Sequence, residues 1–441
     1  RAKGPAAANP NPNTKPKSKP KPDEEAPALP EITGVIIRVE DGALVVSISA
    51  DEAVELAQNQ EELLRTFAAP LRLDLLASEA THRKRLEALR AAEDYGVGGP
   101  ATPVRDIILG EAAPDPRPRF HPTLGTAQYN GGLNQIQMDA VRLALSSNRV
   151  TLIHGPPGTG KTTTLVELIL HAGADRQKVL VCAPSNVAVD NVLERLAEAS
   201  AADGAPNLKL VRLGHPARLK PLALRHSLEA RIAEADESRL VEDTRKELGQ
   251  GIRQLSRTGR RQAERRRELR AEVRALRKEL RGRERKVVRD VLEAADVVLA
   301  TCTGASSSVL RPFEEFDLVI IDEAAQALEA DCWRAILKGK NLVLAGDHKQ
   351  LPPTLRNDGG KGKNKLGYTL FERLIGGAHG EVISRMLTVQ YRMNATICRW
   401  ASEAMYSGRL VPGDGVGERR IFDLVPNPNP NANPNPNPNP N

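Results

Sequence analysis

The sequence predicts an α/β protein with a parallel sheet, and three features of the chain indicate this fold. A glycine-rich loop at residues 155–162 stands between a short apolar run and an amphipathic helix. Further apolar runs of four or five residues follow along the chain, and each ends in small polar or acidic residues. Helical patterns lie between several of them, as in sheets whose strands run in one direction. Such sheets bind ligands at the carboxyl ends of their strands.

The glycine-rich loop fits the phosphate-binding pattern Gly-x-x-x-x-Gly-Lys-Thr. Its glycines permit positive φ angles, so successive N–H groups can point at one anion beside a helix N-terminus. Lys161 can reach the β- and γ-phosphates of a nucleotide, and the Thr162 hydroxyl can hold Mg²⁺. A chance glycine turn would need neither the strand before it nor the helix behind it. We therefore predict a triphosphate site formed by Gly155, Pro156, Pro157, Gly158, Thr159, Gly160, Lys161, Thr162 and Thr163.

Composition limits the class of protein. With 441 residues, 40% apolar and 27% charged, the chain has room for roughly two to four globular domains. The net charge of +7 favours an anionic partner, although aromatic residues, at 3%, are too few for an extended base-stacking surface. Four cysteines without a Cys-x-x-Cys pair argue against a zinc finger and favour a reducing compartment. No apolar run reaches ~18 residues, so we expect no contact with a membrane.

The first part of the chain divides into a tail and a small domain. Residues 1–30 are rich in Pro, Lys and Asn, which predicts a disordered tail. Apolar residues then alternate on both sides of Asp41-Gly42, which is typical of a β-hairpin, and residues 71–75 can add another strand. These elements predict a small β-barrel, followed by a charged helix at 78–94.

A connector at 96–132 precedes a helix that carries a candidate nucleotide contact. The prolines of the connector argue against a regular helix there. The next helix begins near Leu133 and carries Gln137, whose amide can pair with the N6/N7 edge of adenine. Most exposed glutamines bind nothing, but the position of Gln137 shortly before the glycine-rich loop makes it a candidate adenine contact.

Two carboxylates, Asp322 and Glu323, directly follow the apolar run at 318–321. In a parallel sheet this places them at the end of a strand, beside the glycine-rich loop. We predict that Asp322 holds Mg²⁺, usually through water, and that Glu323 orients and deprotonates the attacking water. An isolated Asp-Glu pair is commonly solvated, but a buried strand and a phosphate-binding loop in the same chain favour the catalytic interpretation.

Two further strand ends carry polar candidates. Ser185 and Asn186 follow the strand predicted at 179–183, where small polar residues suit contact with a phosphate chain. Either residue can equally be the cap of the helix that follows. Gln350 follows the strand predicted at 341–345, where an amide can sense a γ-phosphate or be an ordinary loop residue.

The strand predicted at 386–389 is followed by Tyr391 and Arg392. An arginine just past a strand, supplied from a second domain, suits a finger on the γ-phosphate, and Tyr391 can stack on the base. The Asn-Pro repeat at 426–441 predicts an unfolded tail, because alternate prolines can build neither helix nor sheet.

A strongly basic segment lies in the middle of the chain. Between Arg245 and Asp290 there are 18 Lys and Arg residues but seven Asp and Glu. Apolar residues at heptad spacing, Leu269, Val273, Leu276 and Leu280, predict a helical hairpin packed along one seam. A solvated helix face usually mixes charges more evenly, so contact with nucleic acid is favoured.

Taken in order, these motifs resemble the superfamily 1B helicases of the nonsense-mediated-decay helicase and senataxin group, and within it the immunoglobulin mu-binding protein 2 type. The resemblance covers about residues 31–425. The strings that carry it are LNQIQ at 133–137, HGPPGTGKTTT at 154–164, APSNVAVDN at 183–191, LGHPAR at 213–218, TCTGA at 301–305, IDEAAQALE at 321–329, AGDHKQLPP at 345–353 and LTVQYRM at 387–393.

The resemblance implies a RecA-like P-loop NTPase fold. It implies a β-barrel on a helical stalk at 31–95, a RecA-like domain at 133–355 with a helical insertion at 224–294, and part of a second RecA-like domain at 356–425. The later motifs of the family do not follow Arg392, and the chain opens on Arg1 rather than Met. We therefore expect a truncated member of the family.

The resemblance also implies ATP and Mg²⁺ as cofactors, single-stranded RNA or DNA as partner, and 5′-to-3′ helicase activity. Gln137 would contact adenine, Gln350 would couple hydrolysis to movement, and Lys161, Glu323 and Arg392 would act in catalysis. Contact with the nucleic-acid backbone would come from Ser185, Asn186, Thr303 and Gly304. We further expect a monomer in cytoplasm and nucleus, with ribonucleoprotein or ribosome-associated factors as partners.

Two alternatives remain open at this point. The truncated chain can be a nucleic-acid-binding fragment that binds ATP without productive turnover. More remotely, it can be a P-loop ATPase that does not act on nucleic acid.

Overall fold

The computed structural model describes residues 34–40, 43–48, 79–96, 98–119, 129–216, 219–235, 237–258, 262–313, 315–355 and 365–420. The chain forms two compact units, residues 1–76 and residues 77–441. In the first unit, strands β1 (Gly34–Glu40) and β2 (Ala43–Ile48) pair antiparallel, which confirms the predicted hairpin. The strand predicted at 71–75, the rest of the barrel and both predicted tails lie outside the described residues.

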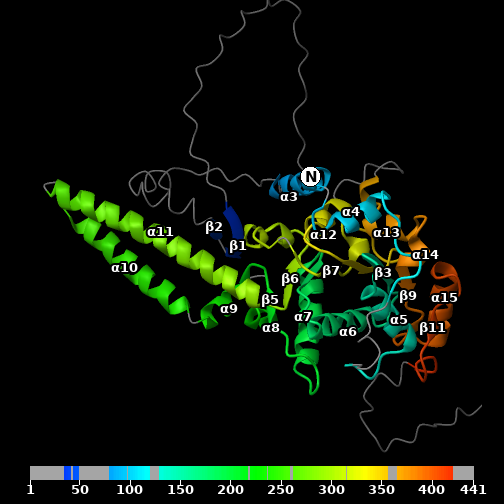
Figure 1. The fold of residues 1–441 in the computed structure, drawn as a ribbon. Helices are drawn as coiled ribbons and strands as arrows, with labels where there is room; N and C mark the ends of the chain where they lie inside the picture. Colours follow the sequence, from blue (N-terminus) through cyan, green and yellow to red (C-terminus); the bar gives the residue numbers. More distant parts are fainter. Residues whose placement is uncertain are drawn as a thin grey trace, which may run out of the picture. The chain divides into compact units, whose positions relative to one another are not determined.

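A seven-stranded parallel sheet forms the centre of the second unit (Figure 1). It confirms the α/β fold that the apolar runs predict. The strands lie in the order β5 (Leu210–Arg212), β6 (Val297–Thr301), β4 (Val179–Ala183), β7 (Leu318–Ile321), β8 (Leu342–Gly346), β3 (Val150–His154) and β9 (Ser384–Met386).

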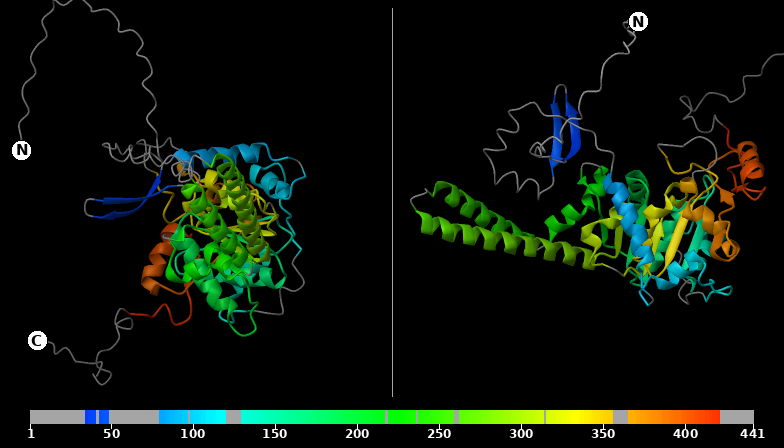
Figure 2. Two further views of the ribbon diagram at one scale, coloured as in Figure 1. Left: turned by 90° about the vertical axis from the view of Figure 1, so that its left-hand side faces the viewer. Right: turned by 90° about the horizontal axis from the view of Figure 1, so that it is seen from above.

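Helices cover both faces of this sheet (Figure 2). In β4, Leu180 and Cys182 point into one apolar layer, while Val179 and Val181 point into the other. Burial on both sides explains why central strands such as β4 and β7 are apolar at every position rather than at alternate ones. One face carries α5 (Gln135–Ala144), α6 (Lys161–Ala174) and α7 (Asn186–Ser200); the other carries α3 (Glu79–Glu93), α4 (Thr102–Leu109), α12 (Glu329–Ile336) and α13 (Leu370–Ile375).

Three local features differ from the sequence expectation. The connector is not free of helix: α4 lies within it, because Pro103 stands in the first turn, where its missing N–H costs nothing. The edge strand β5 was not predicted. The single strand expected at 386–389 is two strands, β9 in the main sheet and β10 (Val389–Gln390), which pairs with β11 (Val411–Pro412).

The basic segment forms the predicted helical hairpin. Its two long helices are α10 (Ser238–Arg257) and α11 (Ala263–Ala294), which lie side by side in Figures 1 and 2. Leu269 and Val273 of the predicted seam are buried. A Cβ on Gly251 would stand 3.2 Å from Val273 Cγ2, so a glycine in α10 lets the helices approach closely.

Shorter elements complete the described part of the chain. They are α8 (Pro221–Arg225), α9 (Leu228–Glu234), α14 (Gly380–Ile383), α15 (Ala395–Met405) and the 3₁₀ turns Gly304–Ser306, Ser308–Leu310, Ala324–Gln326 and Lys365–Gly367. None of the helices in the described ranges is both long and apolar enough to cross a membrane.

A buried ion pair fastens edge strand β5 to helix α7. The Arg212 guanidinium, which is wholly inaccessible to solvent, donates from Nε to Asp190 Oδ1 at 2.9 Å and from Nη1 to the Leu213 carbonyl at 2.5 Å. The Lys220 backbone N–H lies 3.4 Å from Asp190 Oδ2. Two buried charges are tolerated here because each has hydrogen-bonded partners.

Replacement of Asp190 by Ala leaves the Arg212 charge buried without its carboxylate. We expect a loss of about 3–5 kcal/mol in the free energy of unfolding, measured by urea denaturation. Glu194→Ala on the same helix is the matched control, because its 3.3 Å pair with Lys220 is partly exposed and should cost about 1 kcal/mol or less. Equal losses for the two variants would show that the buried pair is not what fastens β5.

Candidate ATP and nucleic-acid site

A cleft of about 180 Å³ lies at the carboxyl end of the sheet. Strands β3, β8 and β7 are neighbours, so the loops that follow them meet at one edge. The cleft therefore joins the glycine-rich loop after β3 to Glu323 after β7 and Gln350 after β8. Its lining residues are Gly155, Pro156, Pro157, Gly158, Thr159, Gly160, Lys161, Thr162, Arg195, Glu323, Gln350 and Arg392.

The glycines of the loop are required by two kinds of constraint. Gly158 and Gly160 have φ of 77° and 76°, in the left-handed region that side chains disfavour. A Cβ on Gly155 would stand 2.8 Å from Lys161 Cβ, and one on Gly158 would stand 2.6 Å from Arg392 Cβ. The loop therefore folds back onto its own lysine and leaves room for the arginine opposite.

Lys161 is held between the two predicted carboxylates. Its Nζ lies 3.0 Å from Asp322 Oδ1 and 2.5 Å from Glu323 Oε1. Burial alone would favour the neutral amine, but the two adjacent carboxylates outweigh it and raise the pKa of Lys161. Lys161 is thus a largely buried cation at neutral pH, and a triphosphate bound in the loop would offer it further negative charge.

Glu323 has an unusual backbone. Its φ is 52°, a left-handed conformation that is rare for a residue with a side chain. The end of β8 approaches the same turn so closely that a Cβ on Gly346 would stand 2.9 Å from the Ala325 nitrogen. Such strain persists where surrounding structure enforces it and is concentrated at functional sites.

The donor set beside Lys161 fits Mg²⁺. The Thr162 hydroxyl and the Asp322 carboxylate offer hard oxygen ligands, which this ion prefers. Asp322 is buried, and its Oδ1 also accepts the Glu323 N–H at 2.8 Å, which fixes the direction of the carboxylate.

Gln137 lies against the glycine-rich loop but already has partners. Its Nε2 donates to the Thr159 carbonyl at 3.0 Å, and its Oε1 accepts the Asn134 N–H at 2.8 Å in a capping box at the start of α5. A primary amide can form up to about four hydrogen bonds, so these contacts orient Gln137 without using its full capacity.

Tyr391 and Arg392 are also fastened to this loop. The Tyr391 N–H donates to the Gly158 carbonyl at 2.8 Å, and its hydroxyl accepts from Asn134 Nδ2 at 2.9 Å. The buried Gln390 side chain accepts the Arg392 N–H at 2.8 Å and so shapes the turn that carries both residues. The structure thus brings Arg392 into the cleft from the segment after β9.

The four residues expected to touch nucleic acid lie at the ends of two neighbouring strands. Ser185 and Asn186 follow β4, and Thr303 and Gly304 follow β6, with Ala183 directly opposite Thr301. Ser185 caps α7 by accepting the Ala188 N–H at 3.2 Å, which confirms the capping alternative. Capping uses the serine oxygen as an acceptor and leaves its hydroxyl proton able to donate.

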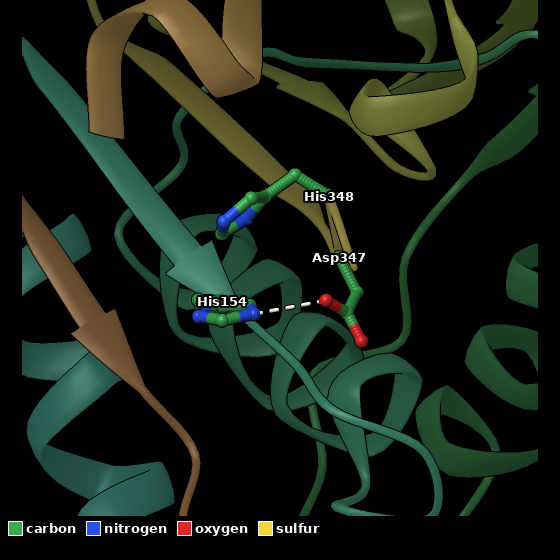
Figure 3. Close-up of side chains that lie close together, drawn as sticks. All are labelled: His154, Asp347 and His348. Carbon is green, nitrogen blue, oxygen red and sulfur yellow. Dashed lines mark hydrogen bonds and ion pairs between the residues drawn. The ribbon is translucent and has the colours of Figure 1, made fainter. Parts of the chain in front are cut away.

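Beneath the cleft is a cluster of imidazoles around Asp347 (Figure 3). His154, at the end of β3, lies 2.9 Å from Asp347 Oδ1, and the His348 ring lies tilted against it with ring centroids 5.0 Å apart. Hydrogen bonds from His154, Gln350 and Tyr406 outweigh burial and lower the pKa of Asp347 to about 2. The carboxylate is therefore an acceptor, and His154 Nε2 carries the proton.

The same three side chains place their ligand atoms within 4.8 Å of one another, a spacing compatible with a metal ion. Asp347, however, already accepts bonds from four donors. Burial, together with the neighbouring His154 ring and the Lys349 side chain, lowers the pKa of His348 to about 4. The geometry favours a hydrogen-bonded cluster over a metal site.

Sequence reasoning missed two parts of this site. Arg195 of α7 lines the cleft, and its Nη1 lies 3.5 Å from Thr163 Oγ1. A single arginine on a helix carries no pattern that separates it from a surface residue. The Asp347 cluster was missed because its partners are far apart in the sequence, although polar residues at the ends of adjacent strands were a usable indication.

Comparison with known proteins agrees with this architecture. Two family models, both described as "AAA domain", match residues 132–358 and 366–435. The DNA-binding protein SMUBP-2 of Mesocricetus auratus is 42% identical over 395 residues, which cover 89% of this chain and 38% of that protein.

Two further relatives are fungal. DNA polymerase alpha-associated DNA helicase A of Schizosaccharomyces pombe is 33% identical over 397 residues (89% of this chain, 55% of that protein). ATP-dependent helicase NAM7 of Saccharomyces cerevisiae is 34% identical over 299 residues (66% and 27%). The chain thus spans 38% of SMUBP-2 and about half of the fission-yeast helicase. Because the first family model matches just over half of the chain, the chain belongs to the AAA domain family, in the superfamily 1B helicase group that its motifs indicate.

Proposed function

We propose that this chain is the ATP-hydrolysing part of a helicase that moves 5′ to 3′ along single-stranded RNA or DNA. The observation that carries the proposal is the largely buried Lys161 cation, whose Nζ lies 3.0 Å from Asp322 and 2.5 Å from Glu323 at the phosphate-binding loop. This arrangement provides a cation for the triphosphate and a carboxylate for the attacking water in one place. The direction of movement rests on the family motifs.

Each group has a defined part in hydrolysis. The loop N–H groups and Lys161 bind the β- and γ-phosphates, and Thr162 and Asp322 would hold Mg²⁺, which neutralises phosphate charge when bound. Glu323 takes a proton from the attacking water. The water oxygen bonds to the γ-phosphorus as the bond between the γ-phosphorus and the leaving oxygen of ADP breaks. Arg392 stabilises the charge that develops on the transferred group, and Gln350 senses its presence.

The nucleotide base and the far side of the phosphates have their own contacts. Tyr391, 40% exposed beside the loop, would stack on the base, and Gln137, bonded to the Thr159 carbonyl, would support the loop on the adenine side. Arg195 approaches from α7 at the level of Thr163, the second hydroxyl of the helix that begins at Lys161. Its guanidinium adds a second positive charge within the first domain, one that does not depend on the segment carrying Arg392.

Nucleic acid would lie across the ends of β4 and β6. Ser185, Asn186, Thr303 and Gly304 offer small polar groups and backbone N–H donors there, which suits contact with phosphates rather than with base edges. The basic hairpin of α10 and α11 would add electrostatic attraction. We propose a monomer in the reducing cytoplasm and nucleus, in keeping with four unpaired buried cysteines, and ribonucleoprotein or ribosome-associated factors as its partners.

A second candidate function is nucleic-acid binding with ATP binding but without productive turnover. The chain spans 38% of SMUBP-2, and this second candidate applies if turnover depends on groups outside the matched part of such a protein. Measurement of ATP hydrolysis with and without single-stranded RNA separates the two candidates. Stimulated hydrolysis supports the first, and binding of both ligands without phosphate release supports the second.

Glu323→Gln removes the base and keeps the size of the side chain. We expect stimulated phosphate release to fall at least about 100-fold, the usual scale for loss of a general base, while the affinity for an ATP analogue changes little. Phosphate release and analogue binding are measured on the same preparation. Turnover that survives this change would show that Glu323 is not the base.

Arg195→Ala removes a charge from the cleft. We expect the Kd for both ATP and ADP to rise about tenfold, because a charge-assisted hydrogen bond to a phosphate contributes on that scale. Arg149→Ala is the control, since Arg149 bonds Asn341 at the opposite end of β3. An unchanged Kd in Arg195→Ala would place this guanidinium outside the phosphate site.

Neutralisation of the basic hairpin tests its contact with nucleic acid. Substitution of four exposed arginines by Gln should weaken binding of a single-stranded oligonucleotide and flatten its salt dependence, by about 0.7 in logarithmic slope for each phosphate that the hairpin no longer neutralises. The four residues are Arg270, Arg274, Arg281 and Arg285.

The matched control replaces four exposed arginines outside the hairpin, Arg83, Arg90, Arg311 and Arg385. It should leave the salt slope nearly unchanged. If both sets of substitutions reduce the salt dependence of oligonucleotide binding equally, the attraction for the oligonucleotide comes from the overall charge of the protein and not from the hairpin. Oligonucleotide affinity that ignores salt altogether would favour a P-loop ATPase that does not act on nucleic acid.

A further inference from the structure

The Asp347 carboxylate is shared between two parts of the chain. Its Oδ1 accepts from His154 Nε2 at 2.9 Å and from the Lys349 N–H at 3.0 Å. Its Oδ2 accepts from Gln350 Nε2 and from the Tyr406 hydroxyl, both at 2.7 Å. Figure 3 shows Asp347 between the ends of β3 and β8, with His154 bonded to it. Each carboxylate oxygen thus holds two donors.

The two donors on Oδ2 come from different surroundings. Gln350 is an exposed residue that lines the ATP cleft. Tyr406 is buried, follows the last residue of α15, and packs in a small apolar cluster with Cys398 and Leu410. The segment that contains Tyr406 is matched by the second family model, whereas Asp347 is matched by the first. One oxygen atom therefore connects the cleft to the second matched region.

Sharing an oxygen makes the two bonds interdependent. A hydrogen bond to an ionised carboxylate is stronger than one between neutral groups, and each donor withdraws part of the charge that the other uses. A Gln350 amide that turns toward a γ-phosphate leaves Oδ2, and the Tyr406 bond then strengthens. By the same reasoning, the Tyr406 hydrogen bond to Oδ2 weakens the Gln350 bond to the same oxygen, so the Gln350 amide can leave Oδ2 more easily.

We propose that Tyr406 is a positioning residue that links α15 to the ATP cleft through Asp347, by sharing Oδ2 with Gln350. The proposal rests on the proposed function only in taking Gln350 to be the group that meets the nucleotide. By thermodynamic linkage the effect is reciprocal: nucleotide in the cleft fastens α15, and α15 in place favours nucleotide. No contact between Tyr406 and the nucleotide is needed.

Tyr406→Phe tests the link because it removes one hydroxyl and keeps the ring in its apolar cluster. Hydrogen exchange of residues 395–405 is measured with and without a non-hydrolysable ATP analogue and Mg²⁺. In the wild-type chain the analogue should slow exchange of α15, and in Tyr406→Phe this protection should be absent. The Kd for the analogue should rise about fivefold, the scale of one shared hydrogen bond.

Ser402→Ala is the matched control for stability. Ser402 is also buried on α15 and accepts the Leu410 N–H at 3.0 Å, but it is not bonded to Asp347. In Ser402→Ala the analogue should still protect α15 from hydrogen exchange, because the substitution weakens only the packing of α15 against its own apolar cluster. Equal loss of protection in both variants would reduce Tyr406 to a packing residue and overturn the proposal.

A double-mutant comparison identifies the route. In a Gln350→Ala background, Tyr406→Phe should change the analogue Kd less than about twofold, because the partner that shares Oδ2 is gone. An undiminished effect in that background would overturn the proposal. Phosphate release is followed in parallel: a wild-type chain that binds the analogue and protects α15 but never hydrolyses ATP contradicts the proposed function alone.

Discussion

A largely buried lysine between two carboxylates is the constraint on which the rest of this structure depends. Lys161 follows β3, while Asp322 and Glu323 follow β7, and β8 lies between these strands. The three charges can meet only if the sheet is parallel and all three strands end at one level. In the central strands β4, β7 and β8, burial on both faces requires apolar residues throughout and leaves charged groups only at the ends.

Glycines set how closely the strand-end loops approach. Gly346 is the last residue of β8, and a side chain there would clash with the backbone of the turn after Glu323. At Gly155 a side chain would clash with the side chain of Lys161. Gly158 leaves room for Arg392, which arrives from a segment far along the chain. At these glycines the loops that line the cleft approach one another too closely for a side chain to fit between them. This close packing holds Glu323 in its strained conformation.

Elements whose burial depends on their own composition could be predicted from the sequence. Elements that depend on partners far away in the chain could not. The apolar runs at 179–183 and 318–321 predict their strands, since composition alone decides burial there. Strand β5 was missed because it has three residues and ends in Arg212, which is buried only by virtue of Asp190 on another element. The roles of the cleft residues in catalysis stay predictions.

Two aspartates show how a rigid sheet can support loops that respond to ligands. Asp190 is fully committed: its partner Arg212 is buried, and the same guanidinium donates from Nη2 to Asn186 Oδ1 at 2.9 Å, which orients a residue expected to meet nucleic acid. Asp347 is committed on one oxygen and shared on the other, between a buried tyrosine and an exposed amide. A carboxylate bonded to a wholly buried guanidinium fixes the segments that it joins, because no ligand can compete for that donor. A carboxylate with one donor facing the cleft can exchange that donor for a ligand, so the second aspartate can transmit occupancy and the first can only preserve geometry.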